Sequence, residues 1–135
     1  MLCYRKSMDG TLNRSILFVA LGGIVGSVCR FLGVAFIVHL LPFTFPFGTL
    51  IVNILGCFGM GAAVGLGERY LWFHHDWRMF VTAGFCGSFT TFSAFAFENV
   101  ELLLDKNYST FAAYSIASFV LCIVAALLGL AIARS

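Results

Sequence analysis

Charged side chains are scarce in this sequence. Of its 135 residues only 10% are Asp, Glu, Lys or Arg, whereas 61% are hydrophobic, and the mean hydropathy is +0.99. A soluble domain carries about 25% charged residues because it needs a polar surface. Lipid must therefore be the solvent for most of this protein's surface. The net charge of +2, with no run of basic residues, gives no indication of a nucleic-acid partner.

Patterns for metal binding, disulfides and catalysis are also missing. The sequence has no CxxC motif and no Cys and His at metal-ligand spacing. It has no recognisable Ser-His-Asp set and no phosphate-binding glycine loop, so an enzyme is not expected. The five cysteines stand singly, and we expect them to pack as small apolar side chains in helices: Cys3, Cys29, Cys57, Cys86 and Cys122.

Four long apolar segments account for most of the chain. They cover residues 16–41, 47–66, 79–104 and 111–133, after a polar N-terminal segment at 1–15. Each has roughly the 20 apolar residues that cross a hydrocarbon core as a helix. The first is too long for a signal-peptide core and lacks a small-residue cleavage site, so we expect it to be retained. The sequence predicts an all-α membrane protein with one membrane domain at 16–135, and Met8 is an alternative start to Met1.

The third segment is unusual because glycines and hydroxyl residues replace the expected Leu and Ile. Its sequence GFCGSFTTFSAF covers residues 84–95. Gly weakens a helix, and Ser and Thr can bond freed backbone groups. At bilayer depth such a stretch predicts a broken helix, which is tolerated where it is buried in protein or lines a polar cavity. Close packing against a neighbouring helix through small residues is the alternative.

Positive charges are distributed unevenly between the two ends of the predicted spans. Six lie on the side of the termini and the second loop, against the single Lys106 on the other side. Because Lys and Arg are enriched in cytoplasmic loops, both termini are predicted to lie in the cytoplasm. The six are Arg5, Lys6, Arg14, Arg69, Arg78 and Arg134.

Arg30 is the one basic residue well inside a predicted span. It shares a helix face with Gly22 and Gly26, at spacings i, i+4 and i+8. The two glycines form a GxxxG pair, which permits a close approach of two helices. An intramembrane charge faces a partner or a wet cavity, so Arg30 could line a vestibule that attracts anions. A snorkelling arginine is the alternative.

Polar and aromatic residues of the second and third segments suggest a path for an anion. The amide of Asn53 could donate to a dehydrated anion, or it could simply bond a neighbouring helix. Phe92 and Phe95 share a face, and their ring edges carry partial positive charge. Glu98 continues that face and could pair with a donor near the end of a pore, or be an ordinary interfacial charge. With 16 Phe in the chain, the two rings alone decide nothing.

Hydroxyl groups recur in the fourth segment. Tyr114 and Ser118 lie on one face at i, i+4, and Ser115 is next to Tyr114 in the chain. These hydroxyls would suit a polar track along a pore. The alternative is that the serines bond their own backbone, as serines in membrane helices often do.

Three sequence blocks together resemble the CrcB/Fluc family of fluoride channels. They are GGIVGSVCR (22–30), FGTLIVNILGCF (47–58) and GFCGSFTTFSAF (84–95), in the family's order on the first three helices. The resemblance covers essentially the whole chain. It implies an antiparallel dimer with two fluoride pores in the bacterial inner membrane, surrounded by membrane lipid. Such a channel exports fluoride from the cytoplasm by passive conduction and so reduces its toxicity.

The resemblance also implies roles for individual residues. Asn53 would donate to fluoride inside the pore. Phe92 and Phe95 would line the path with their positive ring edges, and Arg30 would lie at the vestibule. The polar track of the fourth helix would be Tyr114, Ser115 and Ser118.

A structural Na⁺ at the dimer interface is a further implication of the resemblance. Its ligands would be the backbone carbonyls of Gly87 and Thr90, contributed by both subunits. Oxygen ligands suit this hard cation, and a broken helix frees carbonyls without adding a charge. The chain departs from the family at Ala94, where Thr is common, so one hydroxyl of the track is missing while Ser93 remains.

The charge bias is a second departure from the family. Members that insert in both orientations should show nearly balanced Lys and Arg, whereas this chain favours one orientation. Two assemblies therefore stay open. One is a homodimer in antiparallel dual topology, and the other is a heterodimer with an oppositely oriented homologous subunit.

Two other functions compete with fluoride conduction. A proton-coupled exporter of the small multidrug resistance type has four short helices as well, but it depends on a Glu in its first helix. Residues 16–41 contain no Asp or Glu. A scaffold subunit that transports nothing alone is the other alternative, although the short loops offer no recognisable peptide-binding surface.

Overall fold

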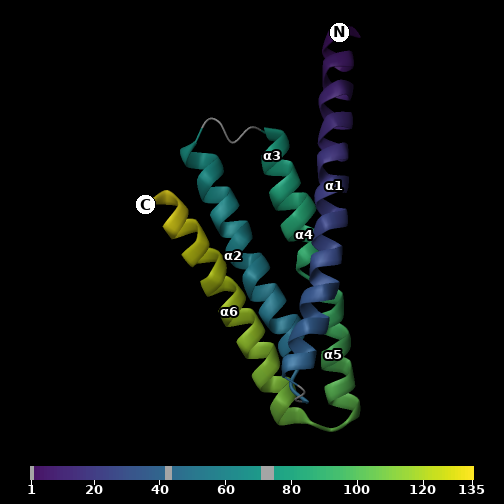
Figure 1. Ribbon diagram of the computed structural model, residues 1–135, viewed down its shortest axis with the longest axis vertical. Helices are drawn as coiled ribbons and strands as arrows, with labels where there is room; N and C mark the ends of the chain where they lie inside the picture. Colours follow the sequence, from purple (N-terminus) through teal and green to yellow (C-terminus); the bar gives the residue numbers. More distant parts are fainter. Residues whose placement is uncertain (1, 42–43, 71–74) are drawn as a thin grey trace.

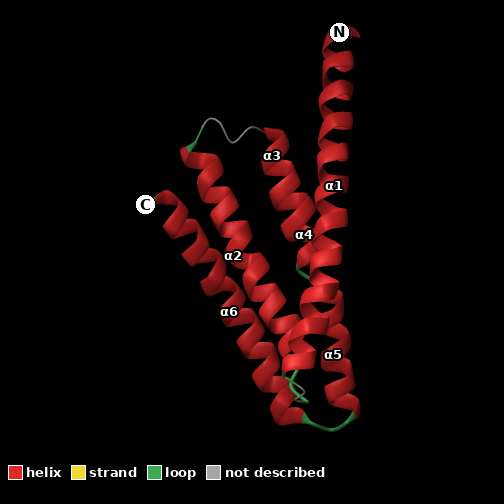
Figure 2. Cartoon of the chain, viewed as in Figure 1, coloured by secondary structure: helices red, strands yellow, loops and turns green. Residues whose placement is uncertain are grey.

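The structure is a computed structural model that describes residues 2–41, 44–70 and 75–135, with the backbone alone for residues 2–11. All regular structure in these ranges is helical (Figures 1 and 2). The side chains of Arg5 and Lys6, two of the six charges counted above, lie outside the described part. The elements are α1 (Leu2–Leu40), α2 (Phe47–Arg69), α3 (His75–Met79), the π-helix η1 (Phe80–Cys86), α4 (Gly87–Phe89), α5 (Phe92–Leu104) and α6 (Tyr108–Arg134).

Four helical units are long and apolar enough to cross a membrane, as the sequence predicted. They are Leu12–Leu40 of α1, the whole of α2, the joined unit His75–Leu104, and α6. The first helix begins at Leu2 instead of residue 16, because helical hydrogen bonds are internal and the helix can continue into polar sequence. Both termini, the end of α2 and the start of α3 point to the same side of the molecule, and the N-terminal part of α1 extends well beyond the other three (Figure 1). Their cytoplasmic location stays a prediction.

The third spanning unit is broken, which confirms the prediction from its glycine- and hydroxyl-rich sequence. α4 ends at Phe89 and α5 begins at Phe92. Thr90 and Thr91 between them have extended backbone, with ψ of 154° and 119°. The Thr91 side chain accepts a hydrogen bond from the Ala94 amide and so caps α5. The break therefore has a defined start and end within two residues.

Glycines bring α1 and η1 into backbone contact. A Cβ on Gly22 would overlap the Phe80 carbonyl oxygen, and a Cβ on Gly26 would overlap that of Phe85. From the other side, a Cβ on Gly84 would lie 3.0 Å from Gly22 Cα. The close approach predicted from the GxxxG pair is confirmed. The segment 84–95 thus combines a broken helix with packing through small residues.

The same type of contact joins α2 to α6, which lie side by side (Figures 1 and 2). A Cβ on Gly61 would overlap the Ala126 carbonyl oxygen, and a Cβ on Gly129 would overlap that of Phe58. Few large side chains are buried between the helices, and most large apolar residues are exposed. This distribution is expected where lipid is the solvent, because lipid tails drive no apolar collapse.

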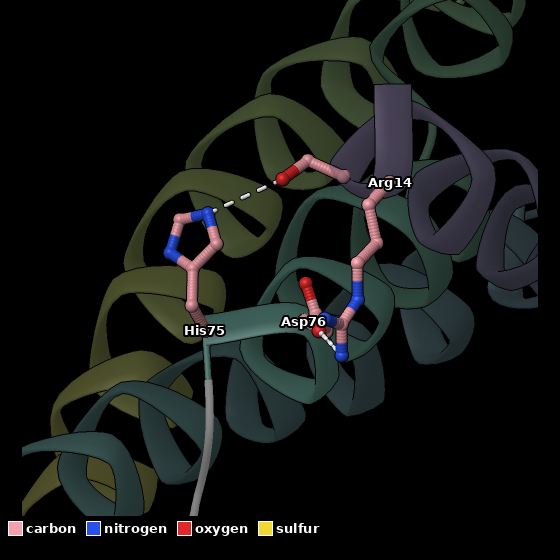
Figure 3. Close-up of polar contacts among 4 residues, drawn as sticks. Arg14, His75 and Asp76 are labelled. Carbon is pink, nitrogen blue, oxygen red and sulfur yellow. Dashed lines mark hydrogen bonds and ion pairs between the residues drawn. The ribbon is translucent and has the colours of Figure 1, made fainter. Parts of the chain in front are cut away.

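Polar contacts fasten α1 to α3 at the end that carries the termini (Figure 3). Arg14 and Asp76 form an ion pair at 2.5 Å, and Ser15 Oγ lies 3.3 Å from His75 Nε2. The Arg14 side chain is 67% exposed, so solvent screens the ion pair and its contribution to stability is about 0–1 kcal/mol. The glycine contacts, not this ion pair, determine how closely the helices pack.

Gly26→Ala should destabilise the fold, because its methyl group would overlap the Phe85 carbonyl oxygen. We expect a loss of about 1–3 kcal/mol from overpacking. Gly33→Ala on the same helix is the matched control, since a Cβ on Gly33 would lie 3.4 Å from Val52 Cγ2, an ordinary contact. The measurement is the temperature at which each purified variant loses its monodisperse elution peak. Equal temperatures for the two variants would contradict the backbone contact.

Candidate functional site

The amide of Asn53 pairs with the backbone at the break. Its Nδ2 donates to the Thr91 carbonyl at 3.1 Å, and its Oδ1 accepts from the Thr91 amide at 2.7 Å. These bonds satisfy the backbone groups that extended Thr91 would otherwise leave unpaired in a bilayer. Asn53 is 9% exposed, and its second Nδ2 hydrogen is not used by this pairing. Bonding to a neighbouring helix is thus confirmed, and donation to an anion stays a prediction.

A pocket of about 270 Å³ lies beside this pairing, between α2, the break, α5 and α6. α2 contributes Asn53 and, one turn further, Cys57, while α6 contributes Ser118 and, one turn further, Cys122. No charged side chain is among its described lining residues. The side chains of Asn53 and Ser118 therefore form a polar level in the pocket, and most of the surrounding surface is apolar. The remaining lining residues are Thr90, Thr91, Phe92, Phe95 and Phe119.

The hydroxyl of Ser118 is a buried donor without a partner. Ser118 is 7% exposed, and its Oγ has no hydrogen bond to any described residue. Leaving such a group unpaired costs about 1–3 kcal/mol. Unpaired buried groups are rare in native structures, and one that lines a pocket suits a ligand that accepts a hydrogen bond from it. The hydroxyl can therefore serve an anion inside the pocket.

Phe92 and Phe95 both line the pocket but differ in exposure. Phe92 is 79% exposed, whereas Phe95 is half-buried against Tyr114, with ring centroids 5.1 Å apart. The rings of Phe92 and Phe95 have centroids 5.6 Å apart and planes tilted by 43°. Their predicted common face is confirmed. Ser93 is not among the lining residues, and its Oγ lies 3.2 Å from Thr91 Oγ1.

A second pocket, of about 360 Å³, is acidic and lies toward the end of α5. Glu98, Glu101 and Asp105 are among its lining residues. Glu98 accepts hydrogen bonds from Thr49 Oγ1 and from the Tyr114 hydroxyl, each at 2.5 Å. The prediction that Glu98 pairs with a donor is confirmed, with one donor from α2 and one from α6. Because its carboxylates repel anions, this pocket is a less favourable binding site for an anion than the first pocket.

Two predicted site residues are bonded outside the first pocket. Ser115 Oγ donates to Asn99 Oδ1 at 2.9 Å. Arg30 Nε donates to the Ser88 carbonyl at 3.2 Å, near the carbonyl end of the helical stretch formed by η1 and α4. A cation is favoured at such an end by the helix dipole. Neither side chain is among the lining residues, and the vestibule role of Arg30 stays a prediction.

The carbonyls of Gly87 and Thr90 are among those that the break frees from helical hydrogen bonds. In a continuous helix the Thr91 amide would donate to Gly87, but here it donates to Asn53. Likewise the Ala94 amide, the helical donor for the Thr90 carbonyl, donates to the Thr91 side chain. These are the two carbonyls that the resemblance assigns to Na⁺. Their chemistry fits a hard cation, although two carbonyls are fewer ligands than such a cation takes.

Sequence reasoning missed several residues that the structure places with the site. Thr49 lies one turn before Asn53 on α2, and Cys57 lies one turn after it. Cys122 follows Ser118 by one turn on α6. Repetition at i, i+4 was therefore the available signal for all three. Asn99 also lies one turn after Phe95, but this spacing did not indicate that it accepts a hydrogen bond from Ser115.

Asn53→Ala should loosen the break, because Thr91 would lose both hydrogen-bond partners. Amide hydrogen exchange in peptides covering residues 87–95 should accelerate by about tenfold, as expected for losing 1–3 kcal/mol of local stability. Asn107→Ala is the control, because Asn107 accepts from the Thr110 amide at the start of α6. It should leave exchange at residues 87–95 unchanged. Unaltered exchange in Asn53→Ala would contradict the role of this pairing.

The chain was compared with known families and proteins. The family model described as "CrcB-like protein, Camphor Resistance (CrcB)" matches residues 17–130. A protein of Phocaeicola vulgatus named "Fluoride-specific ion channel FluC" is 42% identical over 117 residues, which is 87% of this chain and 96% of that protein. One of the same name from Azobacteroides pseudotrichonymphae is 40% identical over 116 residues, or 86% and 93% of the two chains. Since the family model covers most of the chain and both relatives match nearly end to end, this protein belongs to the CrcB-like family.

Proposed function

We propose that this chain is the subunit of a fluoride-selective channel. It lets fluoride leave the cytoplasm passively across the inner membrane and so reduces fluoride toxicity. The observation that carries the proposal is the buried, unpaired Ser118 hydroxyl, which lines the same pocket as the Asn53 amide. The relatives named as fluoride-specific channels support fluoride as the ion.

The donors of the first pocket suit a small, strongly hydrated anion. A conducting site must replace the water around the ion without trapping it. The second Nδ2 hydrogen of Asn53 and the Ser118 hydroxyl are neutral donors, and the ring edges of Phe92 and Phe95 add weak positive charge. No Lys or Arg is among the described lining residues, so no full opposite charge holds the ion there. Several modest, neutral contacts match passive conduction.

Beyond this pocket, the path continues along α6 toward Glu98. Tyr114 lies one turn before Ser118, and its hydroxyl donates to Glu98, as does that of Thr49. An anion at this level would compete with the carboxylate for the same two hydroxyls. Glu98 thus keeps these donors oriented when no anion is present. Movement of the hydroxyls between carboxylate and fluoride would carry the ion past this point.

We further propose that two chains assemble in antiparallel orientation. Phe92 lies at the pocket but is largely exposed in one chain, and Gly87 beside the break is exposed as well. Irregular backbone at membrane depth is tolerated only where protein buries it or where it lines a cavity. Either a second copy of this chain or an oppositely oriented homologue would cover this side. The uneven distribution of positive charges favours the homologue.

A structural Na⁺ between the two chains fits the freed carbonyls. Gly87 and Thr90 would each contribute one carbonyl oxygen from each chain. Hard cations take several oxygen ligands, so the pair from one chain would not suffice. Bound there, Na⁺ would supply a positive charge that joins the carbonyls of the two breaks.

Proteoliposomes containing the protein should release fluoride and retain chloride. Phe92→Ile and Ser118→Ala should each slow fluoride efflux by about fivefold, because each removes a contact of about 1 kcal/mol from the path. Ser118→Ala should keep the thermal stability of the wild type, since this hydroxyl has no described protein partner to lose. A fluoride electrode measures the efflux.

Phe97→Ile is the matched control for the aromatic variant. Phe97 is on α5 and 64% exposed, but it does not line the pocket, so efflux should match the wild type. Expression in a fluoride-sensitive bacterium should raise the fluoride concentration that the cells tolerate. If well-folded protein gave no flux, both alone and with a homologue of opposite charge bias, the channel assignment would fail.

Removal of Na⁺ should weaken the proposed dimer, because the freed carbonyls would lose their shared ligand. Blue-native electrophoresis of the chain expressed alone should give a dimer in Na⁺ that dissociates when N-methylglucamine replaces it. A dimer that forms only on co-expression with an oppositely biased homologue would establish the heterodimer. Monomers under both conditions would refute assembly, and a dimer indifferent to Na⁺ would refute the cation's role.

A further inference from the structure

Cys57 and Cys122 form a second level in the first pocket. Cys57 lies one turn beyond Asn53 on α2, Cys122 lies one turn beyond Ser118 on α6, and both thiols line the pocket. The two thiols lie close enough to interact, on the facing sides of the contact between α2 and α6. Both cysteines are partly buried, and neither is in a disulfide. The fold therefore pairs two thiols that the sequence keeps far apart.

The contact between α2 and α6 holds the two thiols together. One turn beyond Cys57 is Gly61, and one turn beyond Cys122 is Ala126. At that level the helix backbones touch, since a Cβ on Gly61 would overlap the Ala126 carbonyl oxygen. Backbones packed this closely cannot separate or rotate without losing their contacts. The thiols are thus preorganised as a pair, with little freedom to move apart.

We propose that Cys57 and Cys122 form a two-coordinate binding site for a soft divalent cation, represented by Hg²⁺. Thiolates are soft ligands that select soft metals. A structural Zn²⁺ site needs four protein ligands, and the described residues contain no group of three or more His, Cys, Asp and Glu that could hold a metal. Hg²⁺ is satisfied by two sulfur ligands in a linear arrangement, which two facing thiols can provide.

The charge of the complex selects a divalent ion. As each S–Hg bond forms, the thiol proton passes to water, so binding one Hg²⁺ releases two protons. Two thiolates then cancel the two charges of the ion, and the complex is neutral. A monovalent soft ion such as Ag⁺ is neutralised by one thiolate, so the second thiol would keep its proton and be a weaker ligand, because the thiolate is the form that binds metals.

Bound mercury would also obstruct the ion path, a consequence that rests on the proposed function. The ion would lie one helical turn from the level of Asn53 and Ser118 in the same pocket. It would occupy space that fluoride needs, and its thiolate sulfurs offer an anion no donors. We therefore expect Hg²⁺ to block fluoride efflux.

The test titrates purified protein with mercuric nitrate in chloride-free buffer and then adds excess 2-mercaptoethanol. Intact-mass spectrometry should show one retained Hg²⁺ per chain, with two reactive thiols lost. Cys57→Ser and Cys122→Ser should each release mercury on the order of a hundredfold more readily, because a single sulfur loses the advantage of chelation. Cys29→Ser is the matched control, since Cys29 is an exposed cysteine on α1, and it should retain mercury like the wild type.

Mercury that leaves the wild type as readily as the two single variants would overturn the site. Fluoride efflux is the second readout. With efflux expressed relative to each protein's own rate before mercury is added, Hg²⁺ should block the wild type and Cys29→Ser but spare Cys122→Ser, and retention without block would refute the obstruction. Absence of efflux before mercury is added would count against the proposed function alone, because mass spectrometry still judges the site.

Discussion

Two hydrogen bonds between the Asn53 side chain and the Thr91 backbone underlie the arrangement of the site. A helix cannot stop inside hydrocarbon without exposing N–H and C=O groups, each of which costs several kcal/mol when unpaired. A carboxamide carries a donor and an acceptor like those of a peptide group, so Asn53 can replace both missing partners at once. Without this pairing the N–H and C=O groups of Thr91 would have no partner inside hydrocarbon, and the break would be less stable.

Packing through glycines makes room for this polar interior. Between lipid-solvated helices there is little apolar driving force, so close backbone contact supplies the attraction. The contacts of Gly22 and Gly26 with η1, and of Gly61 with α6, leave little space for large side chains between those helices. The pocket lies where the break interrupts such packing. An unpaired hydroxyl such as that of Ser118 can persist there because the surrounding contacts outweigh its cost.

α2 and α6 form two walls of the pocket. The way their residues lie opposite one another determines which polar groups face the pocket at each helical turn. Asn53 and Ser118 form a level of neutral donors, while Cys57 and Cys122 form a level of soft thiols one turn away. One turn before Ser118 on α6, the Tyr114 hydroxyl donates a hydrogen bond to the Glu98 carboxylate. An anion in this pocket meets donors without full charges, and the acidic groups lie beyond them. The same arrangement therefore bears on both the proposed conduction and the proposed mercury site.

The sequence by itself determined the four spans and the break. The scarcity of charges and the length of the apolar segments indicate which residues lie in lipid. A charge or an unpaired peptide group is costly in hydrocarbon, whichever neighbours the helix has. Glycine spacing indicated the contact of α1, and GFCGSFTTFSAF indicated the irregular backbone, since both are local properties of one segment. The common face of Phe92 and Phe95 followed from helical periodicity in the same way.

Only the tertiary structure decided which groups meet. Periodicity places residues on a common helix face but does not say which neighbour that face contacts. That depends on how each helix is rotated and how deeply it is inserted relative to the others. The pairing of Asn53 with Thr91, the bond of Arg30 to Ser88 and the absence of Ser93 from the pocket are therefore invisible in the sequence. The physical reason is that hydropathy is a property of each segment by itself, whereas hydrogen bonds between helices depend on how the helices pack against one another.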